Sequence, residues 1–223
     1  MNVYKDHGGS SVHLENVRIE LLNAAVLVVG VPGSGSEKMV PMNTIQTFLN
    51  TRGVGAYIPT DGPLPPHLLP LSVSRNFDPA LLTSALGWKE LSITDWLRHI
   101  LDEAPSHADF DPTRSAEFAE RLLVILTRAL PSVPKTVVDA AVQLLQPKAC
   151  IPTTLGLKLP QESYFQTAHI FSDLPILKLP SNSVVKGNLE KILLALGVRK
   201  HVDLQIVFDR CAVFVVISSS VTD

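Results

Sequence analysis

The stretch at residues 78–103 constrains the fold most, because it carries the start and stop signals of two helices. Asp78 is a good N-cap, and Pro79 suits the first helical position, where an N–H group would have no partner within the helix. Gly87 can adopt the positive φ that ends the first helix. Ser92 can cap a second helix, whose apolar residues recur at helical spacing. This stretch therefore predicts a helical hairpin.

The sequence pattern of this hairpin is repeated near the end of the chain. Residues 192–198 repeat the pattern of 82–88, and Asp203 takes the place of Ser92 as the cap of the helix that follows. Periodicity, capping residues and prolines predict further helices at 43–53, 112–130 and 134–146, and short strands at 26–31, 54–58, 150–153 and 176–179. We therefore expect an α+β fold that is mainly α, with helical hairpins and a few short strands.

Four prolines at residues 60–71 mark the best boundary, since they forbid a helix and favour an extended connection. The domain organisation that we expect is an N-terminal α/β segment at 1–60, a proline-rich connection at 61–71, a helical region at 72–147, a small α/β region with the second helical hairpin at 148–210, and an atypical tail at 211–223.

The composition is apolar. Hydrophobic residues make up 46% of the chain and charged residues 18%, against a usual charged share of about 25%. A partner, or parent sequence beyond this chain, could cover part of the surface. The net charge of -2 provides no global field that would attract nucleic acid or a membrane. No secretory signal opens the chain, and the apolar runs at 24–31 and 211–217 are shorter than the roughly 20 residues of a membrane helix, so we expect a cytoplasmic protein.

The glycine-rich residues 30–38 are the only stretch that looks like a phosphate-binding loop. A P-loop needs a lysine directly before Ser or Thr at the start of a helix, whereas Lys38 precedes Met39 and Pro41 soon follows. A flexible turn is the preferred interpretation. No nucleotide cofactor is therefore expected.

Candidate metal and catalytic residues do not group in the sequence. The seven histidines show no pair at metal-ligand spacing, and Cys150 and Cys211 lie far apart and fit buried thiols in a reducing compartment. No nucleophile elbow points to a catalytic serine. We therefore predict no enzyme activity, no catalytic residue, no cofactor and no metal site.

Four residues are candidates for interaction with a partner. Trp88 and Trp96 are best interpreted as core anchors, although exposed tryptophans would favour binding. Arg199 and Lys200, followed by His201, form a basic loop between two helices, which would suit a helix-turn-helix reader of DNA. The helix after this loop carries few polar groups that could touch base edges, so a solvated loop is the preferred interpretation.

Four runs resemble a region of large fungal proteins of unknown function that carry an HSP90-type ATPase domain of the sacsin and NO VEIN kind. They are VPMNTIQTFLNTRGVGAYIPT at 40–60, PLSVSRNFDPALLTSALGWKELSITDWLRHI at 70–100, ACIPTTLGLKLPQESYFQTAHIFSDLPILKLP at 149–180 and LLALGVRKHVDLQIVFDR at 193–210. The resemblance implies a region downstream of the ATPase, whose own motifs this sequence lacks. Because residues 211–223 depart from the pattern, we expect a fragment of a longer protein.

The resemblance and the absence of a convergent polar motif predict a non-catalytic scaffold or protein-interaction region. Its partner would be another protein or the parent ATPase domain, and neither a membrane nor a metal is expected. The alternative is a nucleic-acid-binding module that uses residues 199–210 as its recognition hairpin. An independent enzyme is the third hypothesis.

Overall fold

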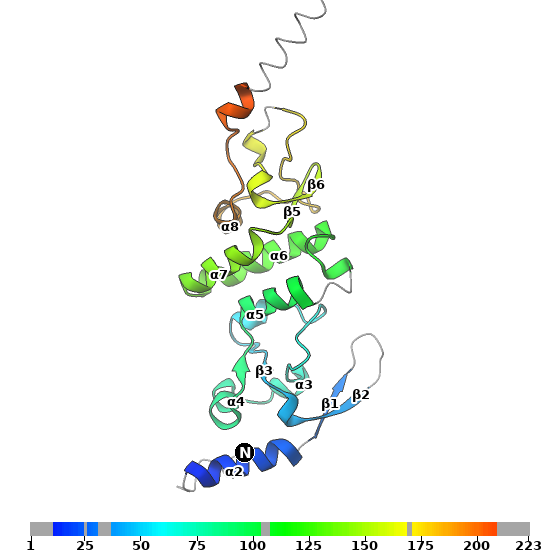
Figure 1. Cartoon of the computed structure of the whole chain (residues 1–223), viewed down its shortest axis with the longest axis vertical. Helices are drawn as coiled ribbons and strands as arrows, with labels where there is room; N and C mark the ends of the chain where they lie inside the picture. Colours follow the sequence, from blue (N-terminus) through cyan, green and yellow to red (C-terminus); the bar gives the residue numbers. More distant parts are fainter. Residues whose placement is uncertain (1–10, 25, 31–36, 104–107, 169–170, 209–223) are drawn as a thin grey trace, which may run out of the picture. The chain divides into compact units, whose positions relative to one another are not determined.

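The computed structural model describes residues 11–24, 26–30, 37–103, 108–168 and 171–208. The chain divides into two compact units, Met1–His99 and Ile100–Asp223, which we name unit 1 and unit 2. This boundary falls inside the helical region that the sequence predicts at 72–147. Figure 1 labels the main helices and strands of both units, and the mainly helical α+β class is confirmed.

The described part of unit 1 contains helices, short strands and 3₁₀ turns. In chain order they are α2 (Ser11–Ala24), β1 (Val26–Gly30), β2 (Glu37–Pro41), η1 (Met42–Thr44), β3 (Thr47–Phe48), η2 (Val54–Tyr57), α3 (Leu71–Ser74), α4 (Pro79–Leu86), β4 (Lys89–Glu90) and α5 (Ile93–Arg98). β1 pairs with β2 in antiparallel orientation, and β3 pairs with β4 in parallel orientation. The predicted strand at 26–31 is thereby confirmed.

The first helical hairpin is confirmed together with its caps. The Asp78 side chain accepts a hydrogen bond from the Ala80 N–H at 2.9 Å, with Pro79 at the first helical position of α4. Gly87 has φ of 69°, the left-handed conformation that ends the helix. Ser92 accepts a hydrogen bond from the Asp95 N–H at 3.1 Å and so caps α5.

Two predictions in unit 1 are wrong. The helix expected at 43–53 is instead η1 followed by the extended strand β3, because Leu69 N–H donates to Thr47 O at 2.8 Å and Leu91 N–H donates to Phe48 O at 2.8 Å. The strand expected at 54–58 is the 3₁₀ turn η2. Pairing with distant segments, which helical periodicity does not reveal, determines the conformation here.

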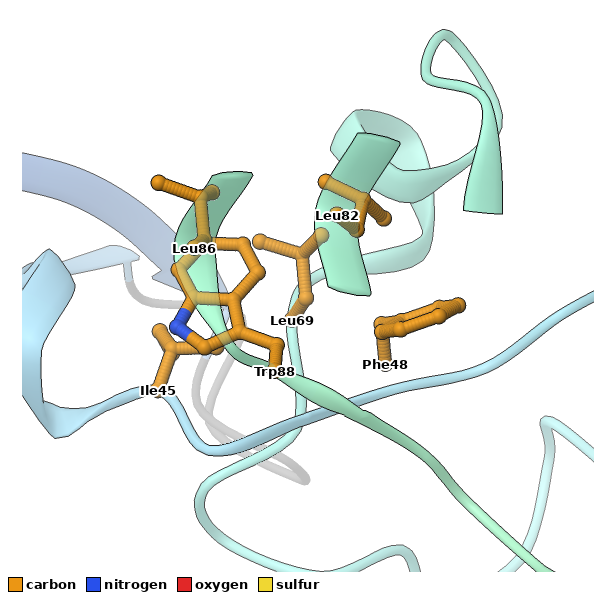
Figure 2. Packing of buried hydrophobic residues seen from close by; sticks show 6 residues of the cluster. All are labelled: Ile45, Phe48, Leu69, Leu82, Leu86 and Trp88. Carbon is orange, nitrogen blue, oxygen red and sulfur yellow. The ribbon is translucent and has the colours of Figure 1, made fainter. Parts of the chain in front are cut away.

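A hydrophobic cluster holds the short elements of unit 1 together. Its buried members are Ile45, Phe48, Leu69, Leu82, Leu86 and Trp88. Figure 2 shows these side chains gathering from separate segments of the chain into one cluster. Leu22 of α2 packs against it, and the Arg18 guanidinium donates to Leu86 O at 3.0 Å. Lys89 and Glu90 of β4 are exposed, so burial of Phe48 in β3 and of Trp88 directly before β4 anchors this two-residue pairing.

Trp96 of helix α5 has a fully buried side chain, and its indole Nε1 has no hydrogen-bond partner among the described residues. A buried N–H without a partner costs about 1–3 kcal/mol.

We predict that Trp96→Phe changes the unfolding free energy by less than about 1 kcal/mol, because removing this N–H offsets the lost apolar contact. Urea unfolding followed by circular dichroism measures the change. Trp96→Ala should cost about 3–5 kcal/mol, and equal destabilisation by both variants would contradict the prediction.

Unit 2 also combines helices with short strands. Its main elements are α6 (Ala116–Ala129), α7 (Lys135–Leu145), β5 (Ile151–Thr153), β6 (Gly156–Lys158) and α8 (Asn188–Leu196), with helical residues at 204–208, and its 3₁₀ turns are η4 (Ala108–Phe110), η5 (Leu130–Ser132), η6 (Pro160–Glu162) and η7 (Gln166–Ala168). A π-helical turn, η3 (His99–Glu103), spans the boundary between the two units. β5 confirms the strand predicted at 150–153. Residues 176–179 form single bridges, Thr153 with Leu177 and Tyr164 with Ile176, instead of a strand.

The predicted start of α6 is wrong. The helix begins at Ala116, where Ser115 accepts a hydrogen bond from the Phe118 N–H at 3.1 Å. Asp111, the predicted cap, closes a turn of its own by accepting from the Thr113 N–H at 2.8 Å and the Thr113 hydroxyl at 2.7 Å. An N-cap residue and a turn residue need the same side-chain oxygen, so the pattern does not distinguish them.

Helix α6 provides the main buried face of unit 2. Its buried apolar residues are Phe118, Ala119, Leu122, Leu123, Ile125, Leu126 and Ala129. α8 buries Ile192, Leu193 and Leu196 and ends at Gly197, whose φ is 107°. The second copy of the pattern, residues 192–198, thus also ends a helix at glycine, as predicted.

Glu120 is a charged residue on the buried face of α6, with 9% of its surface exposed. Its carboxylate accepts hydrogen bonds from the Ser181 N–H at 2.9 Å and from the Ser181 hydroxyl. The loop after Leu179 is thus attached to α6. Burial of a carboxylate is favourable only when donors replace water in this way.

We predict that Glu120→Ala lowers the unfolding free energy by about 1–3 kcal/mol, because it removes the acceptor of two donors at Ser181. Glu117→Ala makes the same change at an exposed position of the same helix and should alter stability by less than about 0.5 kcal/mol. Urea titrations of the two variants provide the comparison. Equal effects would show that the Ser181 hydrogen bonds contribute nothing specific.

Candidate functional site

The candidate site is built around Tyr164 in unit 2. The Tyr164 N–H donates to Pro175 O at 3.0 Å, and Leu177 N–H donates to Tyr164 O at 2.7 Å. On the other side, Phe165 N–H donates to Arg199 O at 2.9 Å. These backbone hydrogen bonds hold three segments side by side, namely 164–165, 175–177 and the chain at Arg199. They place Arg199 next to the buried Tyr164.

The Arg199 side chain lies over the Tyr164 ring, with its guanidinium carbon 5.9 Å from the ring centroid. The same guanidinium donates to the Asp203 carboxylate at 2.8 Å. A stacked, paired arginine loses much of its rotational freedom. It therefore presents a fixed surface to a binding partner.

An open groove of about 370 Å³ lies beside Arg199, and we name it the Arg199 groove. Its lining residues are Leu155, Lys158, Gln161, Glu162, Tyr164, Asp173, Leu174, Pro175, Arg199 and Ile206. Leu155 is 50% exposed, and the helical segment that carries Ile206 also exposes Leu204 and Phe208. The groove thus combines both signs of charge with accessible apolar side chains.

Comparison with known families matches residues 5–214 to one described as "Protein of unknown function (DUF3684)". The chain belongs to the DUF3684 family. Comparisons with curated proteins and with solved structures find no match. The family match spans all the residues of the Arg199 groove and reaches four residues into the predicted tail at 211–223.

The four interaction candidates of the DUF3684 chain are divided between its two units. Trp88 and Trp96 are 4% and 0% exposed, and both belong to unit 1. Arg199 lines the groove in unit 2, whereas Lys200 pairs with Glu190 at 2.7 Å and is not among the lining residues. Only Arg199 therefore contributes to the candidate site.

Sequence reasoning missed the other groove residues. Tyr164 and Leu155 belong to no recognisable motif, and they meet Arg199 only because single backbone bridges join 164 to 176 and 199. Isolated bridges of this kind produce no repeating pattern of apolar residues in the sequence. The one usable signal was the basic loop that follows the glycine stop of α8.

The phosphate-loop hypothesis falls partly outside the described residues, which exclude 31–36. Where a P-loop would open a helix, Glu37–Pro41 forms strand β2. Among the described residues, no group of three His, Cys, Asp or Glu side chains is placed to hold a metal ion. No helix in the same ranges combines the length and apolarity needed to cross a bilayer.

Cys150 is a buried free cysteine, and Cys211 lies outside the described residues. Burial raises the pKa of the Cys150 thiol from 9.0 to about 12, so the folded protein holds its thiol proton more tightly than the unfolded chain. Because the thiolate is the nucleophile, this thiol is inert near neutral pH.

We predict that iodoacetamide at pH 8 labels Cys150 slowly in the native Cys211→Ser protein and rapidly in urea, as mass spectrometry can measure. By linkage, the contribution of this thiol to stability is complete below pH 9.0 and is lost as the pH rises toward about 12. Native labelling as fast as labelling in urea would contradict the assigned burial.

Proposed function

We propose that this DUF3684 chain is a non-catalytic protein-interaction region and that the Arg199 groove binds its partner. The observation that carries the proposal is the arrangement of Arg199 over Tyr164 in the lining of an open groove. Arginine and tyrosine are over-represented among residues that dominate binding energy. Their fixed geometry lowers the entropy lost on binding.

The lining chemistry supports a protein partner. Leu155 and Ile206 can receive an apolar side chain, while Lys158 and Glu162 offer charges of opposite sign at the same groove. A hydrophobic centre with a polar rim is the usual anatomy of a protein interface. The partner would thus present an apolar anchor flanked by charged groups.

We propose the HSP90-like ATPase domain of the fungal sacsin and NO VEIN-like proteins as that partner, in the cytoplasm. The support is the resemblance of the runs at 40–60, 70–100, 149–180 and 193–210 to the region downstream of such a domain. In this proposal the chain acts as a scaffold beside the ATPase.

The nucleic-acid alternative has less support. Arg199 pairs with Asp203, and Lys200 pairs with Glu190, so each cation of the basic loop is already matched by a carboxylate. Binding to phosphates depends on cations that replace condensed counterions. Protein interaction is therefore the preferred function.

The test measures binding of a separately produced HSP90-like ATPase domain to the full chain by calorimetry. We expect Leu155→Asp and Arg199→Ala each to weaken binding about tenfold or more, because both residues line the groove. Val184→Asp is the matched control, since Val184 is 77% exposed and is not among the groove residues. Absence of both binding and altered ATP turnover, or equal effects of all three variants, would refute the proposal.

A further inference from the structure

A second polar surface lies in unit 1, between the turn after β3 and the end of α3. Arg52 and Arg75 line the same small hollow together with Asn50 and Ser74. Phe77 also lines it, as does Phe48, whose other contacts are in the core that Figure 2 shows. The hollow has a volume of about 10 Å³, which is room for one water-sized group.

Among the described residues, the guanidinium groups of Arg52 and Arg75 have no ion-pair or hydrogen-bond partner. Arg18, Arg98, Arg114 and Arg199 form ion pairs, and Arg121 also has an interaction partner. Three other arginines in the described ranges form no ion pair, namely Arg52, Arg75 and Arg128. Two of these three thus share one hollow, which concentrates uncompensated positive charge there.

Two carboxylates near the hollow each accept a hydrogen bond from an uncharged donor. Glu90 accepts a hydrogen bond from the Asn50 side chain at 3.2 Å, and Asp78 accepts from the Ala80 N–H at 2.9 Å as the cap of α4. Neither carboxylate forms an ion pair with Arg52 or Arg75. An external anion would supply the missing counter-charge.

The backbones that carry the two arginines are held in place. The Arg52 N–H donates to the Asn50 side-chain oxygen at 3.0 Å, and the adjoining turn is tight, because a Cβ at Gly55 would lie 2.7 Å from Asn50 O. The Arg75 N–H donates to Leu71 O at 3.2 Å at the end of α3. Fixed backbones lower the ordering cost when both side chains close on one ligand.

From this arrangement we propose that Arg52 and Arg75 form a binding site for a phosphoryl group. Two guanidinium groups present planar pairs of N–H donors, which match the oxygens of a phosphate. The hollow admits one oxygen atom, so the remaining oxygens stay at its mouth within reach of the arginines. The apolar walls lower the local dielectric constant and strengthen these charged hydrogen bonds. This site is independent of the Arg199 groove and of the glycine-rich residues 31–36.

The test titrates the full chain with inorganic phosphate and, separately, with phenyl phosphate at low ionic strength, followed by NMR. We expect saturable shifts for amides around Arg52 and Arg75. Arg52→Ala and Arg75→Ala should each weaken binding about tenfold or more, because each removes charged hydrogen bonds. Arg128→Ala removes an unpaired arginine in unit 2 and should leave the affinity unchanged.

The variants Arg52→Lys and Arg75→Lys keep the positive charge, and circular dichroism checks that every variant is folded. Their affinity for phosphate should lie between that of the unchanged chain and that of the alanine variants. Tighter binding of phenyl phosphate would identify a phosphate monoester whose organic part contacts Phe77, whereas equal or tighter binding of inorganic phosphate would identify the free ion. Failure of both probes to saturate would overturn the site. An equal loss of affinity in Arg128→Ala would do the same.

Discussion

Burial of apolar side chains holds each unit together, because the elements of this fold are too short to be stable alone. Helices α3, α4 and α5 have four, eight and six residues, whereas isolated helices shorter than about 12 to 15 residues are marginal in water. Strands β3 and β4 have two residues each. The cluster around Phe48 and Trp88 in unit 1 supplies the stability that hydrogen bonding within these elements does not.

The same constraint explains where the proposed sites lie. Short elements end often, and their ends place polar side chains on a fixed support. Arg199 follows the glycine that ends α8, and Arg75 follows directly after α3. A groove for a protein and a hollow for an anion can therefore coexist with a largely apolar composition. Each uses a guanidinium group on an anchored backbone, which Ser163 and Phe165 hold at Arg199 and the neighbouring Leu71 holds at Arg75.

The sequence predicts what is local and misses what is distant. Asp78, Ser92 and the glycines at 87 and 197 act through neighbouring residues, so their caps and stops were predicted correctly. Residues 43–53 have helical periodicity but pair with 67–69 and 89–91, and no local pattern records such pairing. For the candidate site, the basic loop pointed to Arg199, while Tyr164 and Leu155 join it only through tertiary contacts.

Native-state hydrogen exchange measured by NMR tests most directly whether side-chain burial stabilises these short pairings. The informative amides belong to Leu69 and Leu91 in unit 1 and to Phe165 and Leu177 in unit 2, each bonded across a pairing of one or two residues. If the hydrophobic clusters hold the pairings, these amides should exchange only through unfolding of the unit that contains them. Exchange as fast as that of exposed turn amides would contradict the account.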